Sequence, residues 1–313
     1  MTKRRLILDC DPGQDDAVNL LLAYSARDSF DLLGITAVAG NAPLALTQRN
    51  ARILADLVGG GDVPIFAGCD RPMARGLITA AHVHGATGLD GVELWEPRTP
   101  LAAQHGVHFL IEALRGALDA SVTLVATGPL TNIAMALQLA PDIAIKIEEI
   151  VLMGGAMREG GNITPSAEFN FYVDPHAAAR VFECGRPITV FGLDVTHQLL
   201  CTPARLARIA AIGGPVARAV HDWLGFFNRF DSAKYDSPGA PLHDPCTMAY
   251  LLMPQLFSLK ACPIAIETQS ALTLGHSAVD FWGVTGAPAN ARWAHGVDSE
   301  GFFDLLVQHL RLF

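Results

Sequence analysis

The sequence predicts an α/β fold: a mostly parallel, open sheet with helices on both faces, in a Rossmann-like arrangement. Two observations carry this prediction. Short apolar runs without polar alternation recur along the chain, and a helix-type segment follows almost every one of them. Strands buried on both faces have this composition, and strand–helix alternation is typical of parallel sheets. No linker, repeat or low-complexity segment divides the sequence, so we expect one domain over residues 1–313.

The expected strands and helices follow one another almost to the end of the chain. The apolar run at residues 6–9 precedes a Pro-Gly turn and a helix over 15–26, and a run rich in β-branched residues at 32–39 precedes a helix that stops at the glycines 59–61. The later elements are assigned on the same grounds. The further expected strands are 63–67, 122–126, 149–153, 188–193 and 263–267, and the further expected helices are 101–118, 128–139, one beginning at 174–175, 203–212, 216–230, 245–252 and 299–310.

Three longer segments lack a helix or strand pattern, and we expect them to be loops at the functional site. They cover residues 69–100, 154–173 and 231–243, and the last is polar and rich in turn residues. Long loops inside a compact domain usually carry function.

The composition is that of an acidic, apolar protein with a large core. Hydrophobic residues make up 50% of the chain, charged residues 17%, and the formal net charge is −9. This balance disfavours nucleic acid and anionic membrane surfaces as partners. No apolar run reaches the roughly 20 residues of a membrane helix. The apolar start stops at Asp9 and is too short for a signal peptide. We therefore expect a cytoplasmic protein, and the apolar content favours a homo-oligomer.

The six cysteines are scattered along the chain, and none stands in a CxxC pair. Structural zinc is therefore not expected, and the thiols are expected to be reduced. Cys10 lies among acidic residues, where a negative field raises the pKa of a thiol. We interpret it as a packing residue and not as a nucleophile.

Four acidic residues stand within eight positions where the first strand gives way to the first helix: Asp9, Asp11, Asp15 and Asp16. In an open α/β sheet, ligands bind beyond the carboxyl ends of the strands. Carboxylates crowd there at neutral pH only if their pKa values separate or a cation neutralises them. Oxygen donors suit Ca²⁺ or Mg²⁺. The alternative is a solvated acidic loop, with two acids in the favoured first turn of a helix.

Further polar residues stand where other expected strands end. Asn41 follows the second strand, Thr127 follows the strand at 122–126, and Asp194 follows the strand at 188–193. Each is also an ordinary turn or cap residue, but all would converge on one edge of the sheet. The loop at 160–170 adds two amides and one carboxylate, which are good partners for sugar hydroxyls, although the same loop is also interpretable as a solvated one.

His243 and Asp244 stand directly before the expected helix at 245–252. Asp244 is interpretable as an N-cap, with Pro245 at the first helical position. In the functional interpretation, Asp244 instead completes the cation site from a distant part of the chain, and His243 is placed to protonate a group near it.

The octet at residues 9–16 closely resembles the DxDPGxDD signature that opens the nucleoside hydrolase family, the inosine-uridine preferring N-ribohydrolases. The resemblance covers most of the chain, in the family's order, and implies a nucleoside hydrolase-like fold. Seven ordered motifs are a specific signal, whereas a single DxDPG is not. The other similar segments are 38–41, 84–91, 126–132, 153–155, 167–170 and 243–245.

The resemblance implies a Ca²⁺ ion at the carboxyl edge of the sheet. Its implied ligands are Asp11, Asp16, the carbonyl of Thr127, and Asp244. It further implies hydrolysis of the N-glycosidic bond of ribonucleosides, to ribose and free nucleobase, by a metal-bound water with Asp11 as the base and an oxocarbenium-like transition state. Family members are commonly dimers or tetramers, which is the expected oligomer here.

The resemblance also implies which residues hold the substrate. The ribose hydroxyls would be bound by acids and amides, and Asp9 would have a supporting role behind them. Phe169 stands inside one of these motifs and is expected at the substrate too. The residues implied for the ribose are Asp15, Asn41, Asn162, Glu168 and Asn170.

The leaving nucleobase needs a proton or hydrogen bond, and His243 is the best candidate to supply it. His84 and Tyr235 are expected near the nucleobase, and either could assist His243. Phe226 and Phe227 could stack on the base or belong to the buried stripe of their helix, and we favour the stripe for Phe226. The presence of His243 fits inosine-uridine or pyrimidine members and does not choose between them.

Two other functions stay open at this level. A haloacid dehalogenase-like, Mg²⁺-dependent phosphatase also starts with a DxD loop, with Asp9 or Asp11 as the nucleophile. The strand ends here are acidic and amide-rich, however, whereas phosphate favours basic ligands. A non-catalytic nucleoside-binding protein on the same fold is the second alternative, although every carboxylate of the implied set is present.

Overall fold

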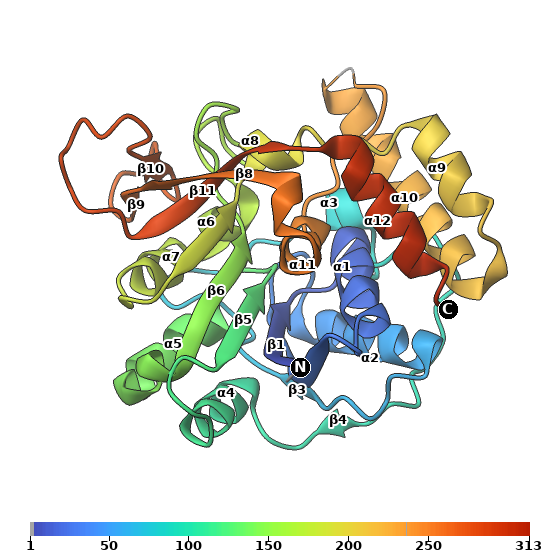
Figure 1. Ribbon diagram of the computed structural model, residues 1–313, viewed down its shortest axis with the longest axis horizontal. Helices are drawn as coiled ribbons and strands as arrows, with labels where there is room; N and C mark the ends of the chain where they lie inside the picture. The colour runs from blue at the N-terminus through green and yellow to red at the C-terminus, as the bar shows by residue number, and fades with distance from the viewer. Residues whose placement is uncertain (1–2, 236) are drawn as a thin grey trace.

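A nine-stranded sheet forms the centre of the molecule (Figure 1). The computed structural model describes residues 3–235 and 237–313, and for residues 230–235 it describes the backbone alone. The sheet order is β4-β3-β2-β1-β5-β6-β7-β11-β8, and only the β11–β8 pair is antiparallel. The strands are β1 (Arg4–Cys10), β2 (Phe30–Ala37), β3 (Ile65–Ala67), β4 (Leu101–Ala102), β5 (Val122–Ala126), β6 (Ile147–Met153), β7 (Ile188–Phe191), β8 (Phe257–Cys262) and β11 (Ala291–Val297).

Helices cover both faces of this sheet, as predicted. Helices α1, α2 and α9 to α12 pack together on one face, and α4, α5 and α7 pack on the other. The helices are α1 (Gln14–Ser25), α2 (Leu44–Val58), α3 (Ala81–His84), α4 (Gly106–Arg115), α5 (Thr131–Leu139), α6 (Phe169–Val173), α7 (Pro175–Phe182), α8 (Leu193–Thr196), α9 (Pro203–Ala210), α10 (Gly214–Tyr235), α11 (Pro245–Leu252) and α12 (Ser299–Leu310), with short 3-10 helices at Pro141–Lys146 and Pro254–Leu256.

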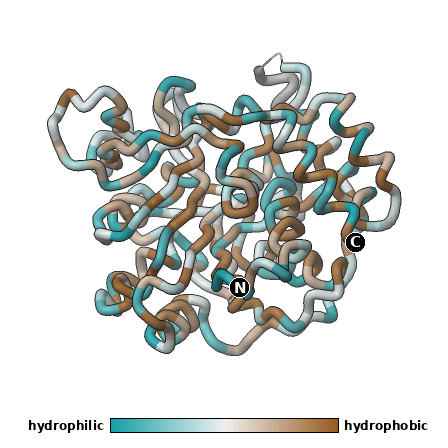
Figure 2. The backbone as a smooth tube through the Cα atoms, in the orientation of Figure 1, coloured by the Kyte–Doolittle hydropathy of each residue, from teal (hydrophilic) through white to brown (hydrophobic). Residues whose placement is uncertain are grey.

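The apolar strands divide the core into two parts. Successive side chains of a strand point to opposite faces, so Leu6 and Leu8 join the core beneath α1, while Ile7 joins the core beneath α4 and α5. Figure 2 shows the central strands as hydrophobic along most of their length. Both faces of β1 are therefore dry, which explains its unbroken apolar sequence.

Several expected elements differ from the observed ones. The segment 101–118 was expected to be one helix, but it forms β4 and then α4, whose first turn is capped by His105 accepting from the Val107 amide. Helix α10 continues to Tyr235, so the connection to α11 is shorter than the expected loop at 231–243. The other two loops contain α3 and α6.

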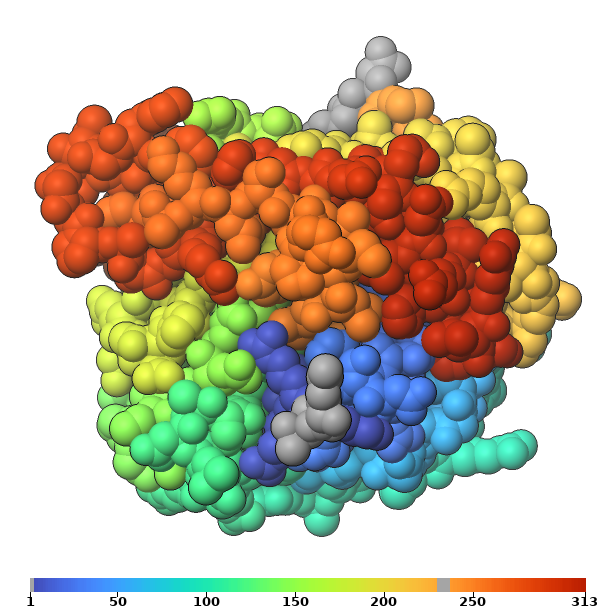
Figure 3. All heavy atoms as spheres, in the orientation of Figure 1, coloured from blue at the N-terminus to red at the C-terminus, as the bar shows by residue number. Residues whose placement is uncertain are grey.

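The carboxyl-terminal strands are the largest departure from expectation. The expected strand at 263–267 is observed as β9 (Ile264–Ile266), but it lies outside the main sheet and pairs antiparallel with β10 (Ser277–Val279) in a separate two-stranded sheet. β8, β10 and β11 were not predicted. β11 mixes Arg292 and His295 with apolar residues, and it pairs antiparallel with the edge strand β8. Figure 3 shows the β9–β10 segment extending from the body of the molecule at the upper left.

β1 lies at the point where the chain changes direction across the sheet. β2 continues on one side of β1, and β5 pairs with it on the other, with Asp9 opposite both Thr36 and Ala126. Crevices form at such a switch point, beyond the carboxyl ends of the strands. Asp11, Thr127 and Asn41 all lie just past these strand ends. The topology therefore confirms the predicted fold class and brings these residues to one edge.

Candidate active site

The turn from β1 into α1 places Asp15 and Asp16 in the first turn of a buried helix. Asp16 Oδ2 accepts from the amide of Gly13 at 3.1 Å, which caps the helix start. A side chain at Gly13 would collide with the ring of His84. The missing Cβ therefore lets the histidine approach the turn that carries the acids.

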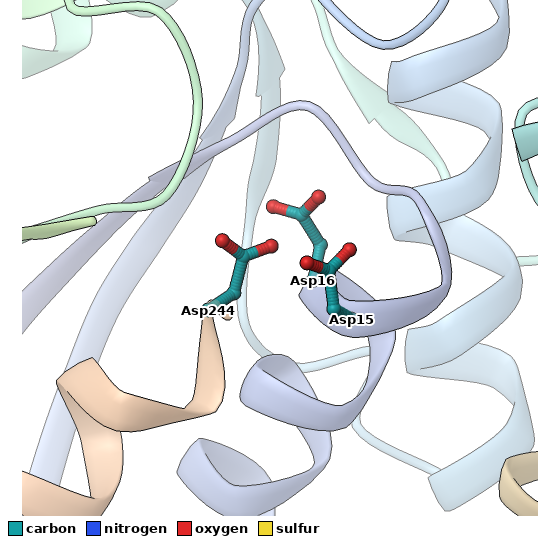
Figure 4. A group of neighbouring side chains, drawn as sticks. All are labelled: Asp15, Asp16 and Asp244. Carbon is teal, nitrogen blue, oxygen red and sulfur yellow. The ribbon is translucent and has the colours of Figure 1, made fainter. Parts of the chain in front are cut away.

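Asp15, Asp16 and Asp244 form a compact acidic group (Figure 4). One carboxylate oxygen from each lies within 4.8 Å of the others, and all three residues are buried. The first two come from α1, and Asp244 stands at the start of α11, so the group joins segments more than 200 positions apart. The figure shows the three carboxylates facing one another.

Electrostatics make this group unstable as a set of bare anions. Burial raises the pKa of Asp244 well above its usual value, and the charges of Asp15, Asp16 and Asp11 raise it further. Burial also raises the pKa of Asp16, although the hydroxyl of Thr127 donates to its Oδ1 at 2.7 Å and opposes the shift. Without a cation, burial therefore favours the protonated forms of Asp16 and Asp244.

Asp11 adjoins the acidic group from the end of β1. Its Oδ2 accepts from the amide of Asn41 at 2.6 Å, and its Oδ1 is buried without a hydrogen-bond partner among the described residues. Burial first, and then the charge of Asp16, raise the pKa of Asp11 well above its usual value. Side chains at Gly40 or Gly128 would strike this carboxylate, so both neighbouring turns require glycine.

These residues fit a hard divalent cation. They supply buried carboxylate oxygens from two distant segments, and Asp11 has an unpaired oxygen beside them. The group of carboxylates that lie within 4.8 Å of one another differs from the ligand set that the resemblance implies. It contains Asp15 and does not contain Asp11. The carbonyl of Thr127 accepts from the side-chain amide of Asn170 at 2.8 Å and keeps a second lone pair.

Asp9 faces away from the acidic group. Its Oδ1 accepts from the hydroxyl of Thr36 and from Nδ2 of Asn132, the latter at 2.7 Å. Burial raises its pKa to about 7. These contacts tie β1 to β2 and α5 and agree with the supporting role that the resemblance implies.

The predicted amides and Glu168 form a polar wall beside the acids. Glu168 caps α6, accepting from the amides of Asn170 at 2.9 Å and Gly155 at 3.0 Å. Burial nevertheless raises its pKa to about 7. Nδ2 of Asn170 donates to two carbonyls, those of Thr127 and Met153, so its Oδ1 is the atom left for a ligand. Asn162 Oδ1 accepts from the amide of Phe169 at 2.9 Å.

A second wall consists of His84, Phe227 and His243. The Phe227 ring lies 5.7 Å from that of His84 and 6.4 Å from that of His243, between centroids. Burial is the main cause that lowers the pKa of both histidines to about 3, so both rings are neutral at physiological pH. Nδ1 of His243 lies 2.8 Å from the hydroxyl of Thr196.

Both walls line one pocket with an empty volume of about 700 Å³, counting the part open to solvent. Asp11 and Asp16 are not among its lining residues and lie behind Asp15, Thr127 and Asp244. The side chain of Tyr235 lies outside the described residues. The lining residues are Asp15, Asn41, Ala80, His82, Val83, His84, Thr127, Met153, Asn162, Ile163, Glu168, Phe169, Asn170, His197, Phe227, His243 and Asp244.

Some site residues were not predicted. His197 lines the pocket, Thr196 contacts His243, and Gln14 contacts His84. No local pattern identifies them, because their roles depend on side chains far away in sequence. Asp194 was a candidate for the site, but its carboxylate accepts from the amides of Met157 and Arg158 and holds the 154–173 loop.

Phe226 was expected in the buried stripe of its helix. It is only partly buried, and the guanidinium of Arg229 lies 5.1 Å from its ring centroid. Phe227 is the buried member of the pair and lines the pocket. The aromatic position at the pocket is therefore that of Phe227.

Comparisons with known proteins agree with this geometry. The family model for the inosine-uridine preferring nucleoside hydrolases matches residues 6–304. The pyrimidine-specific ribonucleoside hydrolase RihA of Shewanella sp. (strain MR-7) is 48% identical over 311 residues, which cover 99% of this chain and 97% of that protein. The solved purine-preferring ribonucleoside hydrolase from Gardnerella vaginalis is 29% identical, with a TM-score of 0.91 over 98% of each chain. The plant nucleoside hydrolase PpNRh1 is 28% identical, with a TM-score of 0.90 over 99% of each.

An open parallel sheet with an acidic group and a pocket at its carboxyl edge, together with these likenesses, defines a glycosidase that acts on N-glycosyl bonds. The chain belongs to the inosine-uridine preferring nucleoside hydrolase family. The family and the fold class expected from the motifs are thereby confirmed. Among the described residues, no helix has both the length and the apolar character to cross a bilayer.

Proposed function

We propose that this ribonucleoside hydrolase is Ca²⁺-dependent and uses Asp11 as the general base. The observation that carries the proposal is the buried acidic group at the pocket floor, where Asp15, Asp16 and Asp244 approach within 4.8 Å. A group of this charge and burial needs a cation to ionise fully at neutral pH. The proposed ligands are Asp11, Asp16, Asp244 and the carbonyl of Thr127, and the geometry adds Asp15 as a further donor.

Ca²⁺ is proposed over softer metals because every nearby donor is an oxygen. When bound, the ion would supply positive charge that orients water and the vicinal hydroxyls of ribose. The many carboxylates and the main-chain carbonyl suit the larger, flexible coordination sphere of Ca²⁺ better than the strict octahedron of Mg²⁺.

In the proposed reaction, Asp11 accepts a proton from the attacking water. Its Oδ1 is the unpaired oxygen, and the Asn41 amide fixes the carboxylate through Oδ2 at 2.6 Å. The water adds to the anomeric carbon as the N-glycosidic bond breaks, and the ribosyl group carries positive charge in between. Glu168 and Asn170 hold the hydroxyls from a wall already fixed by hydrogen bonds, which reduces the entropy lost on binding.

His243 is proposed to assist departure of the nucleobase. Its ring is partly buried and neutral, with Nδ1 engaged by Thr196, so Nε2 is the nitrogen that can face the base. A neutral imidazole with its proton on Nε2 donates a hydrogen bond to the base as negative charge develops there. Phe227 adjoins both histidines and is proposed to pack against the base.

We propose pyrimidine ribonucleosides as the preferred substrates. The support is similarity: the RihA relative, whose name specifies pyrimidines, is 48% identical, whereas the purine-preferring structure is 29% identical. A cytoplasmic location and a homo-oligomeric state, as dimer or tetramer, stay predictions from the sequence.

A substrate panel tests this proposal. The protein is incubated separately with uridine, inosine and p-nitrophenyl phosphate, each with and without EDTA. We expect hydrolysis of the nucleosides, faster for uridine, that EDTA abolishes and Ca²⁺ restores. Phosphate release instead would favour the phosphatase, which is disfavoured because none of the described residues that line the pocket is Lys or Arg. Nucleoside binding without turnover would indicate a binding protein.

A further inference from the structure

Gln14 has a buried side chain that the proposed reaction does not use. Its Nε2 lies 3.1 Å from the main-chain carbonyl of His84 and 2.9 Å from that of Asp90. Carbonyl oxygens only accept hydrogen bonds, so this end of the side chain must be the NH₂ group. The amide oxygen Oε1 therefore points the other way.

That oxygen lies 2.6 Å from Nδ1 of His84. An amide oxygen only accepts, so Nδ1 must carry the proton. In a neutral imidazole, the second nitrogen then has a lone pair and no hydrogen. Burial lowers the pKa of His84 to about 3, and a cation nearby would lower it further, so the ring is neutral in the working range.

We propose that Gln14 is a positioning residue that fixes the tautomer of His84, so that His84 Nε2 accepts a hydrogen bond from an O–H or N–H group of the bound nucleoside. This inference rests on the proposed function and deepens it. His84 then selects for a donor on the substrate and does not protonate the leaving base. His84 and His243 thus differ: the hydroxyl of Thr196 can donate to or accept from Nδ1 of His243, whereas the amide oxygen of Gln14 can only accept, so Nδ1 of His84 must be protonated.

Two donors on a nucleoside could face His84. The ring of His84 lies close to Phe227 on one side and to the turn at Gly13 on the other. The proposed ribose ligand Asn41 lies beside the same turn, because a Cβ placed on Gly13 would be 3.2 Å from its Nδ2. His84 therefore lies between the proposed base and sugar parts of the pocket. The donor is either the 5′-hydroxyl of ribose or an N–H of the nucleobase, and substrate analogues separate these two.

The tautomer is measured directly on the wild-type protein. A long-range ¹H–¹⁵N correlation spectrum of ¹⁵N-histidine-labelled protein distinguishes protonated from unprotonated ring nitrogens, and the His84 signals are those lost in His84→Asn. We expect the Nδ1–H pattern for His84. The Nε2–H pattern, or a doubly protonated ring at pH 7, would overturn the inference whether or not the protein hydrolyses nucleosides, so this result is independent of the proposed function.

Kinetics then test the link to the substrate. Gln14→Met keeps a side chain of similar length but removes both the NH₂ group and the oxygen of the amide. We expect kcat/KM on uridine to fall about tenfold, the effect of one buried hydrogen bond. The same change at Gln48, which does not line the pocket, is the matched control and should leave kcat/KM unchanged. If Gln14→Met does not fold, the spectrum of the wild type still decides the matter.

The analogues are 5′-deoxyuridine and N3-methyluridine. If the 5′-hydroxyl is the donor, wild type and Gln14→Met should differ little on 5′-deoxyuridine and still differ about tenfold on N3-methyluridine. If the base is the donor, wild type and Gln14→Met should differ little on N3-methyluridine and still differ about tenfold on 5′-deoxyuridine. An equal loss on uridine and on both analogues would overturn the inference, because Gln14 would then act on the structure and not through His84.

Discussion

Two parts of the site respond to burial in opposite ways: the acidic wall, formed by Asp11, Asp16 and Asp244 at the back of the pocket, and the histidine wall, formed by His84, Phe227 and His243. On the acidic wall, burial is the largest cause that raises the pKa values of Asp11, Asp16 and Asp244. On the histidine wall, burial lowers the pKa values of His84 and His243 to about 3. Burial disfavours the charged form in both cases. Burial therefore reduces the tendency of both groups to carry charge.

The difference between the walls lies in what each needs in order to function. In the proposed reaction, the acids would need a cation in order to ionise, and an ionised Asp11 could then take a proton, whereas the histidines would act as neutral hydrogen-bonding groups. The acidic wall is built from the ends of β1 and the starts of α1 and α11. The histidine wall is held instead by side chains, Gln14 and Thr196. Substitutions on the two walls should accordingly have effects of different size.

The largest effect is expected for Asp11→Asn. The amide keeps the shape of the side chain but cannot take a proton, so kcat on uridine should fall by about 10³-fold, within the range for loss of a general base. Circular dichroism checks that the fold is kept. A fall of less than tenfold would mean that another group is the base.

Asp244→Asn tests the acidic wall as an ion site. We expect Ca²⁺ affinity, measured by calorimetry, to fall about 100-fold, because one carboxylate of the buried group is lost. Two unit charges 4 Å apart at a partly screened site attract by roughly 4 kcal/mol, and the cost of desolvation reduces this to the smaller figure used here. Glu300→Gln, which removes an exposed acid far from the pocket, is the control. Equal affinity in wild type and Asp244→Asn would remove Asp244 from the site.

The same titration has an expected pH dependence. The pKa values of Asp11, Asp16 and Asp244 are raised, so the metal-free site holds protons that Ca²⁺ must displace. Wild-type affinity should therefore rise with pH, by up to about tenfold per unit for each proton displaced. Affinity that is constant between pH 5 and 8 would show that these carboxyls are ionised before the ion binds.

His243→Ala should separate the histidine wall from the acidic one. We expect kcat on uridine to fall about 100-fold, because hydrogen bonding to the leaving base is lost. p-Nitrophenyl riboside has a good leaving group and should lose far less. Equal losses on the two substrates would remove the role of His243 at the leaving group.

Thr196→Val should have the smallest effect. Valine keeps the shape but removes the hydroxyl that lies 2.8 Å from Nδ1 of His243. Loss of one such hydrogen bond costs about 1 kcal/mol, so kcat on uridine should fall about fivefold while turnover of p-nitrophenyl riboside changes little. Thr196→Ser keeps the hydroxyl and should restore the uridine rate.

The fold was largely predictable where elements are buried and parallel. The strand at 122–126 and the helices at 245–252 and 299–310 have the expected bounds, because apolar runs and Asp-Pro or Asp-Ser starts fix them locally. β11 was missed because it is an antiparallel partner of an edge strand with mixed composition, and such pairing depends on a distant segment.

The site was predictable only in part, for the same reason. The acids and amides follow strand ends, and topology brings strand ends together, so Asn41, Thr127 and Asp244 could be placed near Asp16 before the structure was known. Gln14 and Thr196 have no such signal. Their contacts span 70 and 47 positions of sequence, and only the folded chain shows them.

A crystal structure of the protein with Ca²⁺ and ribose tests the central claim most directly. We expect one ion per chain, with oxygens of Asp16 and Asp244 about 2.3–2.6 Å away, bonded to both vicinal hydroxyls of the sugar. Ribose bound in the pocket without an ion, or an ion bound away from these carboxylates, would contradict it.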